Sequence, residues 1–123
     1  MIGNKDGLHF IIGDALEGLH EVEIWNKYDL LTPTDKMVYL PQFIASLEHE
    51  IKQLESRDIN PDGFFLNLGP TTDDCSCRIE IDGNIAHLSY NLSDQQKKFL
   101  SIDINVLIST YQGVVDVLRT ART

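Results

Sequence analysis

The residues of this chain that could do chemistry lie close together in the second half of the sequence. Two cysteines are one residue apart, Cys75 and Cys77, and two acidic residues come just before them, Asp73 and Asp74. Thiolates and carboxylates can bind metal ions, but structural zinc sites use wider cysteine spacings and a second ligand pair, which this chain lacks. We therefore expect two ordinary thiols, which suit a reducing compartment, and neither a metal ion nor a cofactor.

A thiol beside a histidine would form a nucleophile and its base, and His87 is the histidine that follows these cysteines. Strand alternation argues against this pair, because Cys77 falls on an apolar strand face and His87 on a polar one. His49 starts a zinc-protease pattern that is not completed, since position 53 is Gln53. Phosphate loops, hydrolase motifs and calcium loops are also absent from the sequence. We therefore expect a protein that is not an enzyme.

These residues belong to a predicted hairpin between Cys77 and Tyr90, around Asp82-Gly83-Asn84. A loop at Asp82-Gly83 would place Ile79 opposite Ala86. A loop at Gly83-Asn84 instead pairs Ile81 with Ala86, Ile79 with Leu88, and Cys77 with Tyr90. We prefer the second register because it gathers the apolar residues on one face. The other face then carries Arg78, Glu80, Asp82, His87 and Ser89.

Hydrophobic periodicity predicts the elements around the hairpin. Short apolar or alternating runs predict strands at 8–12, where Gly13 ends the strand, and at 21–27, 37–40, 64–68 and 98–102. Helical spacing predicts one helix from Pro41 to 56–58 and another over 104–118, capped by Asp103 or Asn105, with a frayed end at 120–123. Short links between strands favour antiparallel pairing. The sequence predicts one α+β domain over 1–123, with an antiparallel sheet of about six strands and two amphipathic helices packed on one face.

Charge indicates the kind of partner. The 123 residues include 19 acidic and 10 basic ones, a net charge of −9. This field repels nucleic acid and anionic membranes and attracts basic surfaces. No apolar run is long enough for a membrane span or a leader peptide, so we expect a cytosolic protein.

Acidic residues on predicted strand faces and in one polar loop are the candidate contacts with a protein partner. Trp25 joins them as a candidate anchor, although we favour the interpretation that its ring packs over the sheet edge or a helix. His87 joins them as a cross-strand neighbour of Glu80. The candidates are Glu21, Glu23, Trp25, Asp73, Asp74, Glu80, Asp82 and His87. The sequence leaves the oligomeric state open.

The chain resembles the immunity proteins of bacterial polymorphic toxin and contact-dependent growth inhibition systems. The resemblance lies in its size, its acidity, the run Met37-Val38-Tyr39-Leu40-Pro41-Gln42-Phe43-Ile44-Ala45-Ser46-Leu47, and the second strand-to-helix unit at 98–118. It implies a cytosolic protein that binds one cognate toxin domain and covers its active site or substrate surface. The toxin implied is a nuclease with a basic cleft, and no catalytic residue is implied for the chain itself.

Two other classes stay open. Acidic chaperones of type III secretion are similar in size and charge and carry a C-terminal amphipathic helix, but they usually begin with a helix, whereas this chain begins with a predicted strand. A small thiol or metal enzyme would use Cys75, Cys77 and His87.

Overall fold

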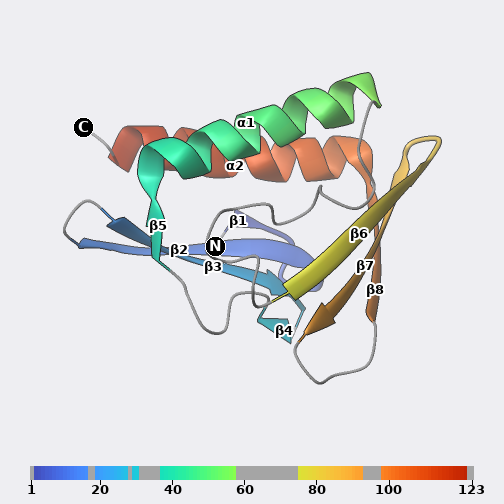
Figure 1. Ribbon diagram of the computed structural model, residues 1–123, viewed down its shortest axis with the longest axis horizontal. Coiled ribbons are helices and arrows are strands. Elements are labelled where there is room, and N and C mark those ends of the chain that lie inside the picture. The colour runs from blue at the N-terminus through green and yellow to red at the C-terminus, as the bar shows by residue number, and fades with distance from the viewer. Residues whose placement is uncertain are drawn as a thin grey trace.

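Two antiparallel sheets and two long helices build the fold (Figure 1). The computed structural model describes residues 2–16, 19–27, 29–30, 37–57, 75–92 and 98–121. The first sheet contains β1 (Ile2–Gly3), β2 (Leu8–Leu16), β3 (Leu19–Asn26), β4 (Asp29–Leu30) and β5 (Met37–Tyr39). The second contains β6 (Cys75–Asp82), β7 (Ile85–Leu92) and β8 (Lys98–Asp103), and the helices are α1 (Leu40–Ser56) and α2 (Ile104–Ala121).

The first sheet is centred on β3. Its order is β1-β2-β3-β4, and β5 also pairs with β3. Along β3, side chains alternate between buried and half-buried, with Val22 and Ile24 inside and Glu23 and Trp25 outside. This period of two is what a strand with one covered face requires. The outer face therefore carries the polar and aromatic residues that the sequence placed there.

Two expected strand ends in this sheet are wrong. Gly13 does not end β2, because the strand continues to Leu16 through a register shift between Ile12 and Ala15, which is a β-bulge. A Cβ atom at Gly13 would lie 2.8 Å from Glu21 Oε2, so glycine leaves room for that side chain. At the other end, β3 stops before Lys27, whose φ of 56° leaves the strand conformation and whose N–H donates to the Gly7 carbonyl.

The hairpin of the second sheet has the preferred register. Ile81 pairs with Ala86, Ile79 with Leu88 and Cys77 with Tyr90, so Gly83 and Asn84 form the loop. Gly83 has a φ of 61°, which glycine adopts at little cost in such a turn. β8 adds to the other side of β7 over six consecutive pairs, from Tyr90–Lys98 to Ile85–Asp103.

The helices begin directly where strands end. Pro41 lies in the first turn of α1, and the helix ends within the predicted range 56–58. Arg57 ends it in the left-handed conformation, which the sequence analysis did not predict. Of the two predicted caps for α2, Asp103 is the one used. Its Oδ1 accepts hydrogen bonds from the N–H groups of Asn105 at 2.8 Å and Val106 at 3.3 Å.

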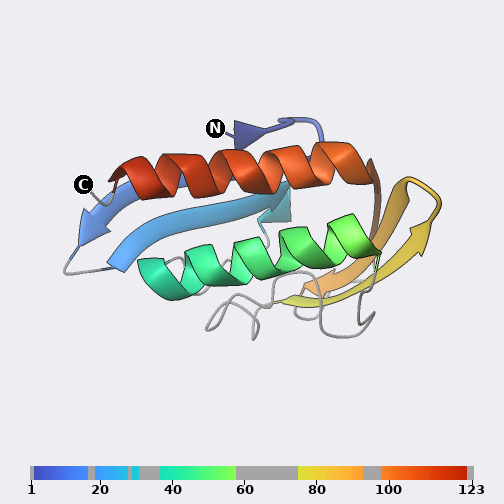
Figure 2. The same cartoon turned by 90° about the horizontal axis from the view of Figure 1, so that it is seen from above.

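The two helices run antiparallel across one face of the first sheet (Figure 2). The hydrophobic core joins residues of both sheets and of the helices, for example Phe10 of β2, Ile79 of β6 and Leu107 of α2. The rings of Phe10 and Tyr111 meet edge to face, with centroids 5.9 Å apart. An ion pair between Glu48 Oε2 and Arg119 Nη2, at 2.6 Å, links the helices at their exposed side.

The turn of the hairpin is attached to both helices. The Ile104 N–H donates to the Asn84 carbonyl at 2.8 Å, at the start of α2. Arg57 Nη2 lies 3.4 Å from Asn84 Oδ1, and Arg57 Nη1 donates to the Leu54 carbonyl at 2.5 Å at the end of α1. The second sheet is therefore held against the ends of both helices.

The predicted α+β class, the antiparallel pairing and the two amphipathic helices are confirmed. The strands divide between two sheets rather than forming one, and the two-residue strands β1 and β4 were not predicted. The strand predicted at 64–68 lies outside the described residues. Neither described helix combines the length and the apolar character needed to cross a membrane.

Candidate functional site

The six described residues among the eight predicted contacts lie on two different sheets. Glu21, Glu23 and Trp25 lie on the outer face of the first sheet. Glu80 and Asp82 on β6 and His87 on β7 lie on the outer face of the second sheet, where all three are exposed. Asp73 and Asp74 lie outside the described residues.

On the first sheet, Trp25 is held by contacts within the sheet. Its ring stacks on that of His9, the residue paired with it on β2, with centroids 6.2 Å apart and planes 6° from parallel. Its indole N–H donates to Glu23 Oε1 at 3.4 Å. His9 Nδ1 lies 3.0 Å from the Gly7 carbonyl oxygen, which holds the imidazole in turn. Of the two interpretations of Trp25, these contacts favour a ring packed on its own sheet over an anchor for a partner.

Apolar side chains border the acidic residues on this face. Ile11 pairs with Glu23, and Leu19 pairs with Tyr39, the residue that precedes α1. All three apolar side chains are exposed, Tyr39 by 58%. The first sheet thus offers a mixed acidic and apolar surface whose aromatic centre is already packed.

The second sheet presents a different outer face. His87 sits in the middle of it, opposite Glu80 on β6 and Ser101 on β8. The expected cross-strand pairing of His87 with Glu80 is confirmed in register, and His87 Nδ1 also lies 2.8 Å from Ser101 Oγ. Two residues from Ser101 along β8, Phe99 is 74% exposed, the most of any large hydrophobic residue in the described part of the chain.

Phe99 was not among the predicted contacts. Phe99 and Leu100 are neighbours and both apolar, so a strand must turn one of them outward. Leu100 packs against the core and pairs with the buried Leu88, which turns Phe99 to the outer face. Strand alternation, counted backward from Ile102, would have found it.

The two cysteines considered as a thiol or metal site are placed by their backbone alone. Cys75 and Cys77 belong to β6, and the pairing of Cys77 with Tyr90 fixes its place in the register. Their side chains lie outside what the structure describes, as do Asp73 and Asp74. The sequence predicted that Cys77 and His87 lie on opposite faces of the hairpin. The register agrees with this prediction, because His87 pairs with Glu80, three residues after Cys77 on β6.

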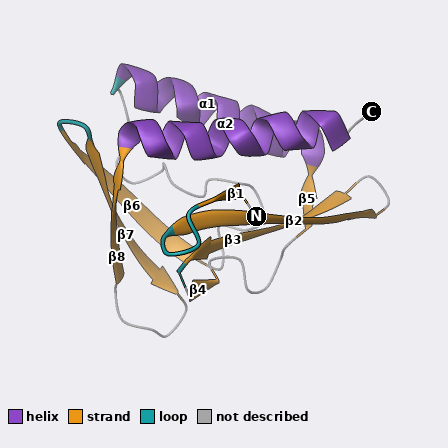
Figure 3. Ribbon diagram, turned by 180° about the vertical axis from the view of Figure 1, so that it is seen from behind, coloured by secondary structure: helices purple, strands orange, loops and turns teal. Residues whose placement is uncertain are grey.

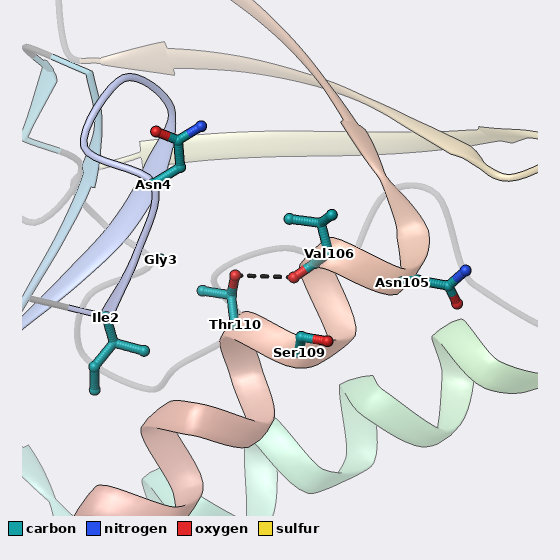
Figure 4. A pocket seen from close by; sticks show the side chains of 7 residues that line it. All are labelled: Ile2, Gly3, Asn4, Asn105, Val106, Ser109 and Thr110. Carbon is teal, nitrogen blue, oxygen red and sulfur yellow. Dashed lines mark hydrogen bonds between the residues drawn. The ribbon is translucent and has the colours of Figure 1, made fainter.

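A groove that the sequence did not suggest lies between β1 and the start of α2 (Figure 4). It encloses about 490 Å³ and is lined by Ile2, Gly3, Asn4, Asn105, Val106, Ser109 and Thr110. Val106 is 48% exposed in it. Thr110 Oγ1 donates to the Val106 carbonyl at 2.9 Å, so this hydroxyl is engaged within the helix.

Comparison with known proteins adds no relative to these observations: no protein-family model, no curated protein and no solved structure matches the chain.

Proposed function

We propose that this protein is a bacterial immunity protein that binds a cognate toxin domain and neutralises it by covering its active site or substrate surface. The observation that carries the proposal is Phe99, a large aromatic side chain 74% exposed on an open sheet face. Burying such a ring against a partner removes apolar area from water, and aromatic residues are over-represented at the centres of protein interfaces.

The charge of the chain supports a basic partner. The net charge is −9, and Glu80 and Asp82 are exposed on the same face as Phe99. A toxin domain that cleaves nucleic acid presents a basic cleft, and an acidic protein can occupy it in place of the substrate's phosphates. The proposed role requires that the protein bind the toxin tightly and cover its active site or substrate surface, and it requires no catalytic group in this chain.

Co-purification with the product of the neighbouring reading frame tests the proposal. We expect a complex of nanomolar affinity, with loss of the partner's toxic activity at equimolar ratio. Phe99→Ala should weaken binding by about tenfold to a hundredfold. Val117→Ala is the matched control, because Val117 is an exposed apolar residue on α2, and it should bind like the unchanged protein. A neighbouring product that is neither bound nor inhibited contradicts the proposal.

The contribution of charge is tested separately, by association kinetics. Replacing both Glu80 and Asp82 by their amides should slow association several-fold at about 50 mM salt and much less at about 200 mM, because salt screens long-range attraction. Glu55→Gln together with Asp6→Asn removes two exposed charges away from this face and serves as the control for net charge. Association that is independent of salt would contradict mimicry of a nucleic-acid charge while leaving the contact at Phe99 to be judged on its own.

A further inference from the structure

The last strand of the second sheet is β8, which carries the exposed ring of Phe99. Among the described residues, β8 pairs with β7 alone, and Figure 3 shows it at the rim of the sheet. An open edge exposes unpaired backbone N–H and C=O groups, which attract other strands. Natural proteins therefore protect such edges with charges, prolines or bulges.

The edge of the first sheet is protected in this way. Beyond β1, which covers only Phe10 and His9, the edge of β2 is interrupted by the bulge between Ile12 and Ala15. The exposed Asp14 lies within that bulge. A strand approaching β2 would therefore meet both a broken register and a charge.

β8 has none of these features over its central residues. From Phe99 to Ile102 it carries no charge and no proline, and its register with β7 is continuous. The central part of the β8 edge therefore lacks the protection that β2 has, and the charges of Lys98 and Asp103 lie only at its two ends.

The directions of the backbone groups along β8 follow from the hairpin. The Ile104 N–H points toward the β7 side, because it donates to the Asn84 carbonyl at 2.8 Å. Backbone groups alternate sides along an antiparallel strand, so Ile102 and Leu100 also point toward β7. Phe99 and Ser101 therefore direct their N–H and C=O groups to the open edge.

The groove between β1 and α2 lies at the end of this edge. Asn105 and Val106, which line it, are the second and third residues after the last residue of β8 (Figure 4). A segment lying along β8 and passing its end would reach this groove, where Val106 offers apolar surface. A second copy of the chain is disfavoured as the occupant, because each copy carries a net charge of −9.

We propose that β8 accepts an extended segment of a basic protein as a fourth strand, hydrogen-bonded to the backbones of Phe99 and Ser101. That such a partner exists follows from the proposed function, on which this inference rests. The inference adds how the protein binds that partner. Main-chain pairing would supply affinity, while Phe99 and the adjacent acidic face would select side chains.

A peptide probe tests strand addition without the toxin. The probe is an eight-residue peptide of alternating valine and lysine, with blocked ends. The first control is the same peptide with N-methyl groups on its two central residues, so that one N–H is blocked on each edge of the peptide strand. The second control is a peptide of alternating valine and glutamate. We expect the first peptide to bind at micromolar to millimolar concentration and both controls to bind at least about tenfold more weakly.

Amide hydrogen exchange locates the binding. With the unmodified peptide near saturation, the amides of Phe99 and Ser101 should gain about tenfold in protection, and those of Leu100 and Ile102 should change little, because they already bond to β7. Equal binding of the N-methylated peptide, absence of binding, or protection elsewhere in the chain would each overturn the proposal.

Two variants of one residue give an independent measurement. Ser101→Pro removes the N–H that faces the open edge and leaves the bonds to β7, and proline is tolerated at such positions of edge strands. Ser101→Ala removes only the hydroxyl that contacts His87. We expect the proline variant to lose peptide binding about tenfold or more and the alanine variant to keep it. Should the proline variant unfold, the exchange pattern of the unchanged protein decides alone.

The two proposals fail separately. Peptide pairing at β8 with no inhibition of the neighbouring gene product contradicts the proposed function and leaves strand addition intact. Inhibition that depends on Phe99 but tolerates Ser101→Pro shows that the face is used without an added strand, and it overturns the inference.

Discussion

The outer faces of the two sheets have similar compositions and different structures. Each carries exposed apolar side chains beside acidic ones, with an aromatic residue among them. On the first sheet, Trp25 is half-buried, stacked on His9 and hydrogen-bonded to Glu23. On the second, Phe99 is 74% exposed on β8, which pairs with β7 alone among the described strands.

The difference shows that an aromatic residue among acids does not by itself mark an interface. A side chain that already stacks and donates within its own sheet contributes to folding, and covering it again gains little. A ring that is left in water still has its apolar area to bury, so it can contribute to binding. The comparison indicates that Trp25 contributes to folding, whereas Phe99 still has apolar area that the proposed partner could bury.

The largest expected effect tests that assignment directly. Trp25→Ala removes the stack on His9 and the bond to Glu23, and it should lower the free energy of unfolding by about 2 kcal/mol. Phe99→Ala should change it by less than about 0.5 kcal/mol. Urea denaturation of both variants measures the two values. Equal losses would mean that the two faces do not differ in the way described.

The turns of the two sheets should also respond differently. Gly83 has a φ of 61° and an open surrounding, so Gly83→Ala costs only backbone strain, about 1 to 2 kcal/mol. Gly7 has equally open surroundings without a positive φ, so Gly7→Ala should be neutral or stabilising by up to about 1 kcal/mol. Thermal unfolding of the pair gives the comparison, and a destabilised Gly7→Ala would contradict it.

A smaller effect separates the two strand-to-helix junctions. Asp103 caps α2 with two hydrogen bonds, whereas Tyr39 begins α1 without any side-chain cap. Asp103→Ala should therefore cost about 1 kcal/mol, and Tyr39→Ala less than about 0.5 kcal/mol. Chemical denaturation with circular dichroism at 222 nm would measure both. A cost at Tyr39 as large as that at Asp103 would show that its exposed ring contributes to folding.

The smallest expected effect concerns the polar contact on the second face. The hydrogen bond between His87 and Ser101 is exposed to water, which competes for both groups. Ser101→Ala should therefore change the free energy of unfolding by less than about 0.5 kcal/mol. A loss above about 1 kcal/mol would mean that this face is organised for folding as well, and it would weaken the contrast with the first sheet.

Local patterns in the sequence predicted most of the second sheet and both helices. Gly83 and Asn84 set the hairpin register, because only that loop gathers Ile79, Ile81, Ala86 and Leu88 on one side. Asp103 was one of the two caps considered. The hairpin register and the helix cap depend on residues that are close in the sequence, so local patterns can predict them.

Features that depend on distant residues were not predictable. At the bulge in β2, Glu21 of the neighbouring strand lies over Gly13, whereas a glycine considered alone suggests the end of a strand. The division into two sheets depends on which strand edges meet in space. The predicted contact residues were divided between two faces for the same reason. Strand alternation placed Glu23 and Glu80 outward, but no local pattern could show that they belong to different sheets.

The direct strand-to-helix connections have a mechanical consequence. Leu40 follows Tyr39 and Ile104 follows Asp103 with no loop between strand and helix, so each helix is a rigid extension of its strand. Tension on β8 would reach α2 without a hinge to absorb it, and the ion pair of Glu48 with Arg119 would carry part of it to α1. A pull on the β8 edge, where we propose that a partner binds, would therefore be transmitted into the core that α2 helps to form.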